Sequence, residues 1–89
     1  MTDRQVERIT SALAEPRRFR ILKELASRNG EMSCAQIVDT HGVSNATISH
    51  HLKELETVEL ISIVREGKCN TIVLRRDVWK AYLARLAEV

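Results

Sequence analysis

The 89-residue chain has few of the residues that mark many special protein classes: two cysteines, one proline, three glycines and only three aromatic residues. Cys34 and Cys69 lie far apart, and neither belongs to a Cys-x-x-Cys motif, so no secreted-type disulfide framework is indicated. No stretch approaches the roughly 20 apolar residues that cross a bilayer, and no signal-type apolar run follows Met1. We therefore expect a soluble, cytoplasmic protein with reduced thiols and no membrane partner.

The motifs of common enzyme classes are also absent. The chain has no Gly-rich phosphate-binding loop and no His-Glu-x-x-His sequence, and it is too short for a deep catalytic pocket. These absences predict a protein that is not an enzyme and that needs no cofactor. The formal net charge of +2 is too small to indicate nucleic-acid binding by itself.

What the chain does have is regular hydrophobic periodicity in several short segments. Hydrophobic residues make up 44% of the sequence, and no repeat, low-complexity segment or linker interrupts them, so residues 1–89 are expected to form one domain. The segments are divided by residues that typically start or end helices: Pro16, Gly30, the Ser33/Gln36 pair and Gly42. The expected elements are helices over residues 3–14, 16–28, 34–40 and 44–55, strands over 61–65 and 71–74, and a helix over 76–88.

The helix expected at residues 44–55, with the sequence SNATISHHLKEL, is the most informative segment. Ser44 is a plausible N-cap, and Ile48, Leu52 and Leu55 recur on one face that should be buried. Short polar groups near a helix N-terminus suit a phosphate backbone and the base edges of a major groove. Because His51 borders the apolar face, we expect it to be half-buried and structural. The outward residues expected to contact DNA are Ser44, Asn45, Ala46, Thr47, Ser49, His50 and Lys53.

Two β-branched runs separated by a polar, Gly-containing segment follow this helix and predict a β-hairpin. Arg65, Lys68 and Asn70 lie near its tip, where a cation can approach a minor groove without reading much sequence. Solvated surface charge is the alternative for this tip. The same two alternatives stay open for Arg17, Arg18 and Arg20. The overall prediction is a mostly α fold with a small β-hairpin, the order of elements of a winged helix-turn-helix.

Three segments carry a resemblance to a known family: ALAEPRRFRILKEL, SNATISHHLKELETVELI and VREGKCNTIVL. They resemble the opening, the recognition helix and the wing of the ArsR/SmtB family of bacterial repressors, and the resemblance runs from Ala12 to about Leu86. It implies a homodimer, formed by the first and last helices, that binds a two-fold symmetric operator on double-stranded DNA and releases it when an inducer binds. It also assigns base or backbone contacts to Asn45, Ala46, Ser49 and His50.

A chain of this size has a marginal core, and surplus apolar surface usually marks an interface. The core of the four central helices is already filled by their own apolar residues, so the apolar residues of the first and last helices are surplus to it. We therefore expect a two-fold dimer, with the two DNA-reading helices about 34 to 36 Å apart. The residues assigned to this interface are Val6, Ile9, Leu13, Trp79, Tyr82, Leu83 and Leu86.

The sequence departs from the family at its metal sites. The three positions of the family's thiol site fall on Ser33, Ala35 and Val38, and its site on the last helix falls near Arg76, Val78 and Val89. None supplies a ligand of the required kind, and a single thiolate does not make a soft-metal site. We therefore expect no metal at either place. Three alternatives remain: an unusual metal site that uses Cys34, His41 or Cys69, a redox switch through Cys34 or Cys69, and a winged-helix module that binds protein instead of DNA.

Overall fold

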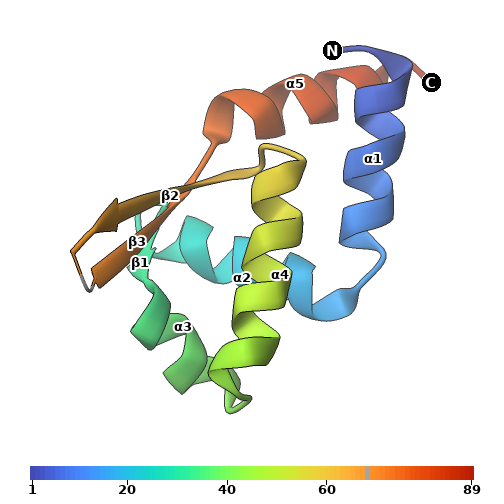
Figure 1. Cartoon of the computed structure of the whole chain (residues 1–89). Coiled ribbons are helices and arrows are strands. Elements are labelled where there is room, and N and C mark those ends of the chain that lie inside the picture. Colours follow the sequence, from blue (N-terminus) through green and yellow to red (C-terminus); the bar gives the residue numbers. More distant parts are fainter. Residues whose placement is uncertain (68) are drawn as a thin grey trace.

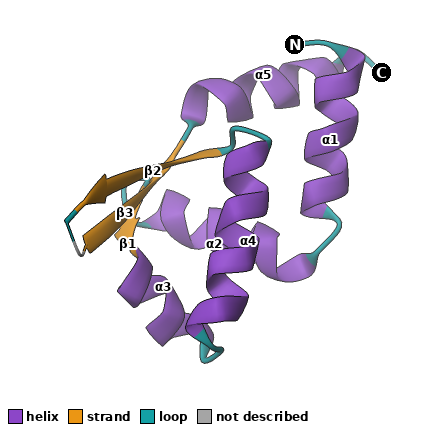
Figure 2. Cartoon of the chain, in the orientation of Figure 1, coloured by secondary structure: helices purple, strands orange, loops and turns teal. Residues whose placement is uncertain are grey.

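The computed structural model describes residues 1–67 and 69–89, without the side chain of Cys69. The described residues form five helices and a three-stranded sheet, and Figures 1 and 2 show the sheet beside the helices, at one side of the molecule. The elements in chain order are α1 (Asp3–Leu13), α2 (Pro16–Ser27), β1 (Glu31–Ser33), α3 (Cys34–His41), α4 (Asn45–Thr57), β2 (Ile61–Glu66), β3 (Cys69–Leu74) and α5 (Arg76–Ala87).

The helices begin where the sequence places caps. Ser33 and Gln36 form a capping box at the start of α3, and Ser44 accepts a hydrogen bond at the start of α4. Pro16 occupies the first turn of α2, where its missing N–H costs nothing. The predicted starts of α2 and α3 are thus confirmed, while α4 continues two residues beyond the expected Leu55.

The sheet contains a strand that the sequence analysis missed. β1 pairs antiparallel with β3, which also pairs with β2, so the strand order is β1-β3-β2 and the wing hairpin (β2 and β3) is part of a three-stranded sheet. Met32 of β1 lies opposite Ile72 and is only 2% exposed. A three-residue strand is too short to show an alternating pattern in the sequence. It forms because it pairs with β3, which is distant in the sequence.

One continuous apolar core joins the helices to the sheet. Its side chains come from α1, α2, β1, α3, α4, β2, β3 and α5, and Ile48, Leu52 and Leu55 form the expected buried face of α4. Phe19 of α2 is a large apolar side chain outside this core and is 47% exposed. The fully buried side chains are Ile9, Ile21, Leu25, Met32, Ile37, Ile48, Leu55, Leu60, Ile61 and Ile72.

The molecule is elongated, with extents of 40 × 21 × 21 Å. Figure 1 shows both termini at one end, where α1 and α5 meet, and the turn between α3 and α4 at the opposite end. The wing projects to one side. This places the two helices assigned to dimer contacts away from the start of α4. Among the described residues, no helix has both the length and the apolar character that spanning a bilayer requires.

Candidate nucleic-acid interface

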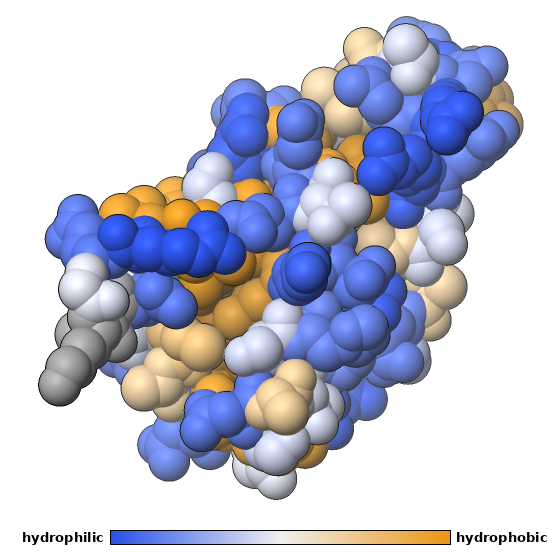
Figure 3. Space-filling model, viewed as in Figure 1, coloured by the Kyte–Doolittle hydropathy of each residue, from blue (hydrophilic) through white to orange (hydrophobic). Residues whose placement is uncertain are grey.

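The outward face of α4 is available along its whole length. Asn45, Ala46, Thr47, Ser49, His50 and Lys53 are all exposed, while the opposite face is buried in the core. Within the described part of the chain, no side-chain hydrogen bond engages Asn45, Ser49 or His50. Figure 3 shows mostly hydrophilic side chains on this side of the molecule, with apolar atoms along the wing hairpin. The face therefore offers donors and acceptors that are not used within the chain.

The first turn of α4 is organised by its own hydroxyl groups. Ser44 Oγ accepts a hydrogen bond from the Thr47 amide at 3.1 Å and lies 2.9 Å from Thr47 Oγ1. These two hydroxyls therefore serve the cap first, and only their remaining lone pairs or protons are free for a phosphate. Both residues remain exposed at the helix N-terminus, where backbone N–H groups favour an anion.

The turn between α3 and α4 depends on Gly42. It ends α3 in the left-handed conformation, with φ 62° and ψ 28°, and its amide donates to the carbonyl of Val38 at 3.1 Å. Glycine adopts this conformation without the steric cost that a Cβ brings. The residue thereby sets the direction in which the chain enters α4.

Gly42→Ala is expected to lower the free energy of unfolding by about 1 kcal/mol. Apart from Gly42 and its two chain neighbours, no described residue has an atom within 4 Å of the position that the new Cβ would occupy, so the cost comes from backbone strain. Urea unfolding followed by circular dichroism measures it. Gly42→Asn, which tolerates positive φ better, is the matched control and should lose less stability. Equal losses in the two variants would contradict this account.

His51 lies on the border of the buried face, as predicted, and is half-buried. Its Nδ1 accepts a hydrogen bond from Arg18 Nε at 3.2 Å, and Arg18 Nη1 donates to the carbonyl of Ala12 at 3.3 Å. Burial lowers the pKa of His51 below its usual value, and the positive charge of Arg18 lowers the pKa further. Arg18 therefore serves an internal contact between α1, α2 and α4.

Arg17 makes a similar contact on the other side of α2. Its Nη1 lies 3.3 Å from His41 Nδ1 and donates to the His41 carbonyl at 3.4 Å. Glu24 accepts a hydrogen bond from Thr40 Oγ1 at 2.9 Å and lies 3.7 Å from His41 Nε2. These contacts fasten the end of α3, just before the turn, to α2. No local pattern predicts these contacts, because Thr40 lies 16 residues from Glu24 and His41 lies 24 residues from Arg17.

Of the three wing residues predicted to contact DNA, the structure describes Arg65 and Asn70. Arg65 forms a two-bond ion pair with Glu56 of α4, at 3.3 and 3.4 Å, and lies opposite Asn70 in the hairpin. Asn70 is exposed. Lys68 lies outside the described residues. Since the Arg65–Glu56 pair is largely exposed, it contributes little stability but aligns the hairpin with the end of α4.

The seven residues assigned to the dimer interface fall into three groups. Leu83 and Leu86 are exposed, at 44% and 42%, whereas Ile9 and Tyr82 are buried within the chain. The Tyr82 hydroxyl lies 2.8 Å from Thr10 Oγ1, so α5 packs on α1 of the same chain. The interface assignment of Ile9 and Tyr82 is corrected accordingly, because the core extends between α1 and α5. The remaining three, Val6, Leu13 and Trp79, are half-buried against that core.

The residues present do not fit the family's metal sites. Across residues 1–67 and 69–89, no group of three or more His, Cys, Asp or Glu side chains is arranged to hold an ion. Cys34 is a free thiol at the start of α3 and is half-buried against the core. The positions that would supply ligands hold Ser33, Ala35 and Val38, none of which is a soft donor.

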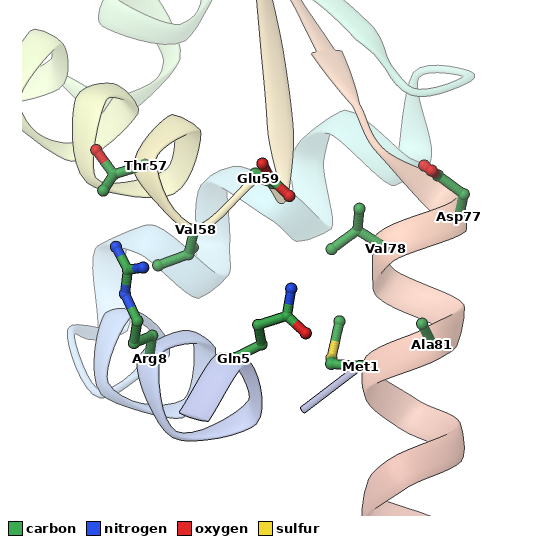
Figure 4. Close-up of a pocket in the computed structure, with 9 residues that line it drawn as sticks. All are labelled: Met1, Gln5, Arg8, Thr57, Val58, Glu59, Asp77, Val78 and Ala81. Atoms are coloured by element: carbon green, nitrogen blue, oxygen red, sulfur yellow. The ribbon is translucent and has the colours of Figure 1, made fainter. Parts of the chain in front are cut away.

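An open cleft of about 330 Å³ lies where α1, the end of α4 and α5 approach one another. Figure 4 shows Gln5 and Arg8 from α1 beside Val58, with Val78 across the same space. Asp77 at its edge is held by Arg75 through two bonds of 3.2 and 3.0 Å, and this hydrogen bonding lowers the pKa of Asp77. No histidine or cysteine is among the nine residues that line the cleft.

Comparison with known proteins identifies the domain type. A family model described as a helix-turn-helix domain matches residues 13–64, from the end of α1 into β2. The chain is 39% identical over 81 residues to a helix-turn-helix transcriptional regulator of Methanocaldococcus jannaschii, a match that covers 91% of this chain and 90% of that protein. It is also 33% identical over 75 residues to the transcriptional repressor SdpR of Bacillus subtilis, covering 79% of this chain and 81% of SdpR.

A solved structure agrees with the sequence relatives. The homodimeric winged helix-turn-helix DNA-binding domain of a possible ArsR-family transcriptional regulator from Mycobacterium bovis superimposes with a TM-score of 0.76 at 30% identity, covering 99% of this chain and 87% of that one. The match includes the wing and both outer helices, so it extends beyond the helix-turn-helix itself. The chain therefore belongs to the ArsR family of winged helix-turn-helix, DNA-binding transcriptional regulators.

Proposed function

We propose that the protein is a homodimeric transcriptional repressor that binds an inverted-repeat operator through α4 and the wing. The observation that carries this proposal is the row of exposed, short polar side chains on α4, whose other face is fixed in the core. An ordinary solvated helix carries long charged residues there. A row of short hydrogen-bonding groups brings the backbone of the helix close to base edges. The proposal assigns no catalytic role to the chain.

Within the major groove, the proposed contacts divide by chemistry. Asn45 and His50 have the donors and acceptors that read base edges, and the side chain of Asn45 suits adenine. Ser49 and Lys53 suit phosphate oxygens, which position the helix without reading sequence. Arg65 in the wing would exchange its Glu56 partner for a phosphate, a change of small cost because the pair is exposed.

The dimer proposal rests on apolar surface that the single chain leaves uncovered. Leu83 and Leu86 lie about one turn apart on α5, and half-buried Trp79 precedes them on the same helical face. The relative from Mycobacterium bovis is described as homodimeric. A two-fold axis through this face would present two copies of α4 to successive major grooves, about 34 Å apart.

The repressor role takes its support from a relative, since SdpR is named as a transcriptional repressor. A dimer that covers a short operator blocks access to the same DNA, and no further activity of the chain is required. The metal-induced release typical of the resembled family is not part of the proposal, because its ligand positions here hold Ser33, Ala35 and Val38.

The experiment that tests the function is a selection from a pool of random DNA duplexes, followed by anisotropy titrations of the retained sequences at several salt concentrations. We expect enrichment of an inverted repeat whose half-sites are about one helical turn apart, with affinity falling steeply as salt rises. Salt-steep binding without enrichment would replace the operator model with nonspecific binding. No binding would favour a winged-helix module that recognises protein.

Leu83→Glu is expected to convert the dimer to a monomer, because a buried, unpaired carboxylate is costly at an apolar interface. Light scattering coupled to gel filtration at micromolar concentration measures the change. Ala84→Glu adds the same charge at an exposed position about 100° around α5 and is the matched control. A monomeric wild-type protein, or equal behaviour of the two variants, would contradict the assigned interface.

A further inference from the structure

The guanidinium of Arg18 joins three helices that are distant in the sequence. Arg18 belongs to the first turn of α2, donates through Nε to His51 of α4, and donates through Nη1 to the carbonyl of Ala12 near the end of α1. Ala12 is buried, and Arg18 and His51 are half-buried, so these contacts are partly shielded from solvent. The last turn of α1 is thereby linked to the middle of α4.

We propose that Arg18 and His51 are positioning residues that fix α4 for operator binding, and that protonation of His51 breaks this contact and weakens binding at acidic pH. The inference rests on the proposed function, since it concerns the same DNA-binding helix. His51 directly follows His50, so holding the His51 ring adds to the packing of the buried face in fixing the rotation of α4, and with it the direction of the outward row. A small rotation of a reading helix misplaces every base contact at once.

The chemistry of the contact requires a neutral imidazole. Arg18 remains protonated at any working pH and can only donate, so Nδ1 of His51 must hold a lone pair and Nε2 must carry the proton. A proton added to Nδ1 removes the acceptor and places an imidazolium against a guanidinium. The contact is therefore present above the pKa of His51 and lost below it.

The charges around His51 agree with this requirement. Arg18 and Arg17 of α2 disfavour the protonated ring, as does His50 on the same helix, whereas Glu15 at the start of α2 favours it. Arg8 of α1 and Glu54 of α4 line a small hollow beside Arg18. Burial and Arg18 hold the pKa of His51 below its usual value of 6.5. The unfolded chain then binds this proton more readily, so the contribution of His51 to fold stability is fully present above its usual pKa of 6.5 and is lost as the pH falls toward the lowered pKa of the folded state.

His41 provides an internal contrast to His51. Its Nδ1 also faces an arginine, Arg17, but its Nε2 lies 3.7 Å from the carboxylate of Glu24. His41 therefore has a carboxylate beside its ring, whereas the charged groups around His51 are mainly arginines. This difference makes His41→Asn the matched control for a His51→Asn variant. Asparagine keeps an acceptor oxygen near the position of Nδ1 but does not titrate.

The test measures operator affinity at pH 7.5 and 5.5 for the wild-type protein, His51→Asn and His41→Asn. His50 is present in all three proteins and is therefore common to the comparison. We expect the ratio of the two dissociation constants to be about threefold larger, or more, in the wild-type protein and His41→Asn than in His51→Asn. Equal ratios in all three proteins would overturn the pH dependence.

Arg18→Gln separates positioning from a direct phosphate contact. As a positioning residue, Arg18 should leave the slope of log affinity against log salt unchanged while its loss weakens binding by about tenfold at pH 7.5. A slope reduced by about 1 would instead make Arg18 a phosphate contact and overturn the proposal. Circular dichroism and light scattering establish that the variant is folded and has the wild-type oligomeric state.

A readout without DNA keeps the inference separate from the proposed function. Nitrogen-15 NMR of the histidine rings reports the tautomer and titration of His51 in the free protein. We expect the Nε2–H tautomer in the wild-type protein and a pKa of His51 that returns toward its usual value in Arg18→Gln. If no duplex binds, the proposed function fails and this titration still decides the contact. Identical titration of His51 in both proteins would overturn it.

Discussion

Replacement of His50 by alanine is expected to weaken binding to the selected operator by about tenfold or more, with the fold and the oligomeric state unchanged. The side chain is exposed on the outward row of α4 and makes no hydrogen bond within the described part of the chain, so its removal leaves the core intact. A good pair between a side chain and a base edge contributes about 1–3 kcal/mol of discrimination. Anisotropy titrations with the operator and with a scrambled duplex measure the loss.

Two controls sharpen the His50 result. Lys80→Ala removes an exposed residue of α5, far from the proposed groove contacts, and should leave the specific affinity unchanged. His50→Gln keeps a donor and an acceptor and should retain part of the discrimination. Unchanged operator affinity in His50→Ala would argue against this part of α4 as the reader. A loss of equal size on both duplexes would make His50 a backbone contact.

Leu55→Ala should be the most destabilising of the changes considered, lowering the free energy of unfolding by about 2–5 kcal/mol. Leu55 has no exposed surface and lies in the core between α4 and the sheet, so its truncation leaves a cavity. Domains of this size have only about 5–15 kcal/mol of stability in total. The variant should therefore lose a large part of its folded population well below the melting temperature of the wild-type protein. Urea unfolding at fixed protein concentration measures the change.

Lys53→Ala, two residues away on the same helix, is the matched control for the stability loss expected of Leu55→Ala. Its side chain is exposed and alanine is a good helix former, so its stability should change by less than about 0.5 kcal/mol. Its operator affinity should fall, in contrast, if Lys53 contacts a phosphate. A loss of less than about 1 kcal/mol in Leu55→Ala would mean that the core closes around the deletion.

Local signals in the sequence determined most of the secondary structure and the placement of the candidate interface on α4. Pro16, the Ser33/Gln36 capping box and Ser44 each start a helix where predicted, because a cap acts on backbone groups within one turn of itself. The spacing of Ile48, Leu52 and Leu55 likewise fixed which face of α4 is buried, and so which face is free. Such features depend on residues at most a few positions apart.

Tertiary structure alone decided how the elements are held together. β1 exists because Met32 lies opposite Ile72, and a pairing over that distance leaves no local pattern in three residues. Arg18 meets His51 across 33 positions, so its role as an internal contact depends on how α2 and α4 pack. Ile9 and Tyr82 have the same apolar character whether they face a partner or their own core, and only the packing of α1 on α5 placed both inside the chain. Periodicity determines the face of a helix, but the choice of neighbour depends on the geometry of the whole fold.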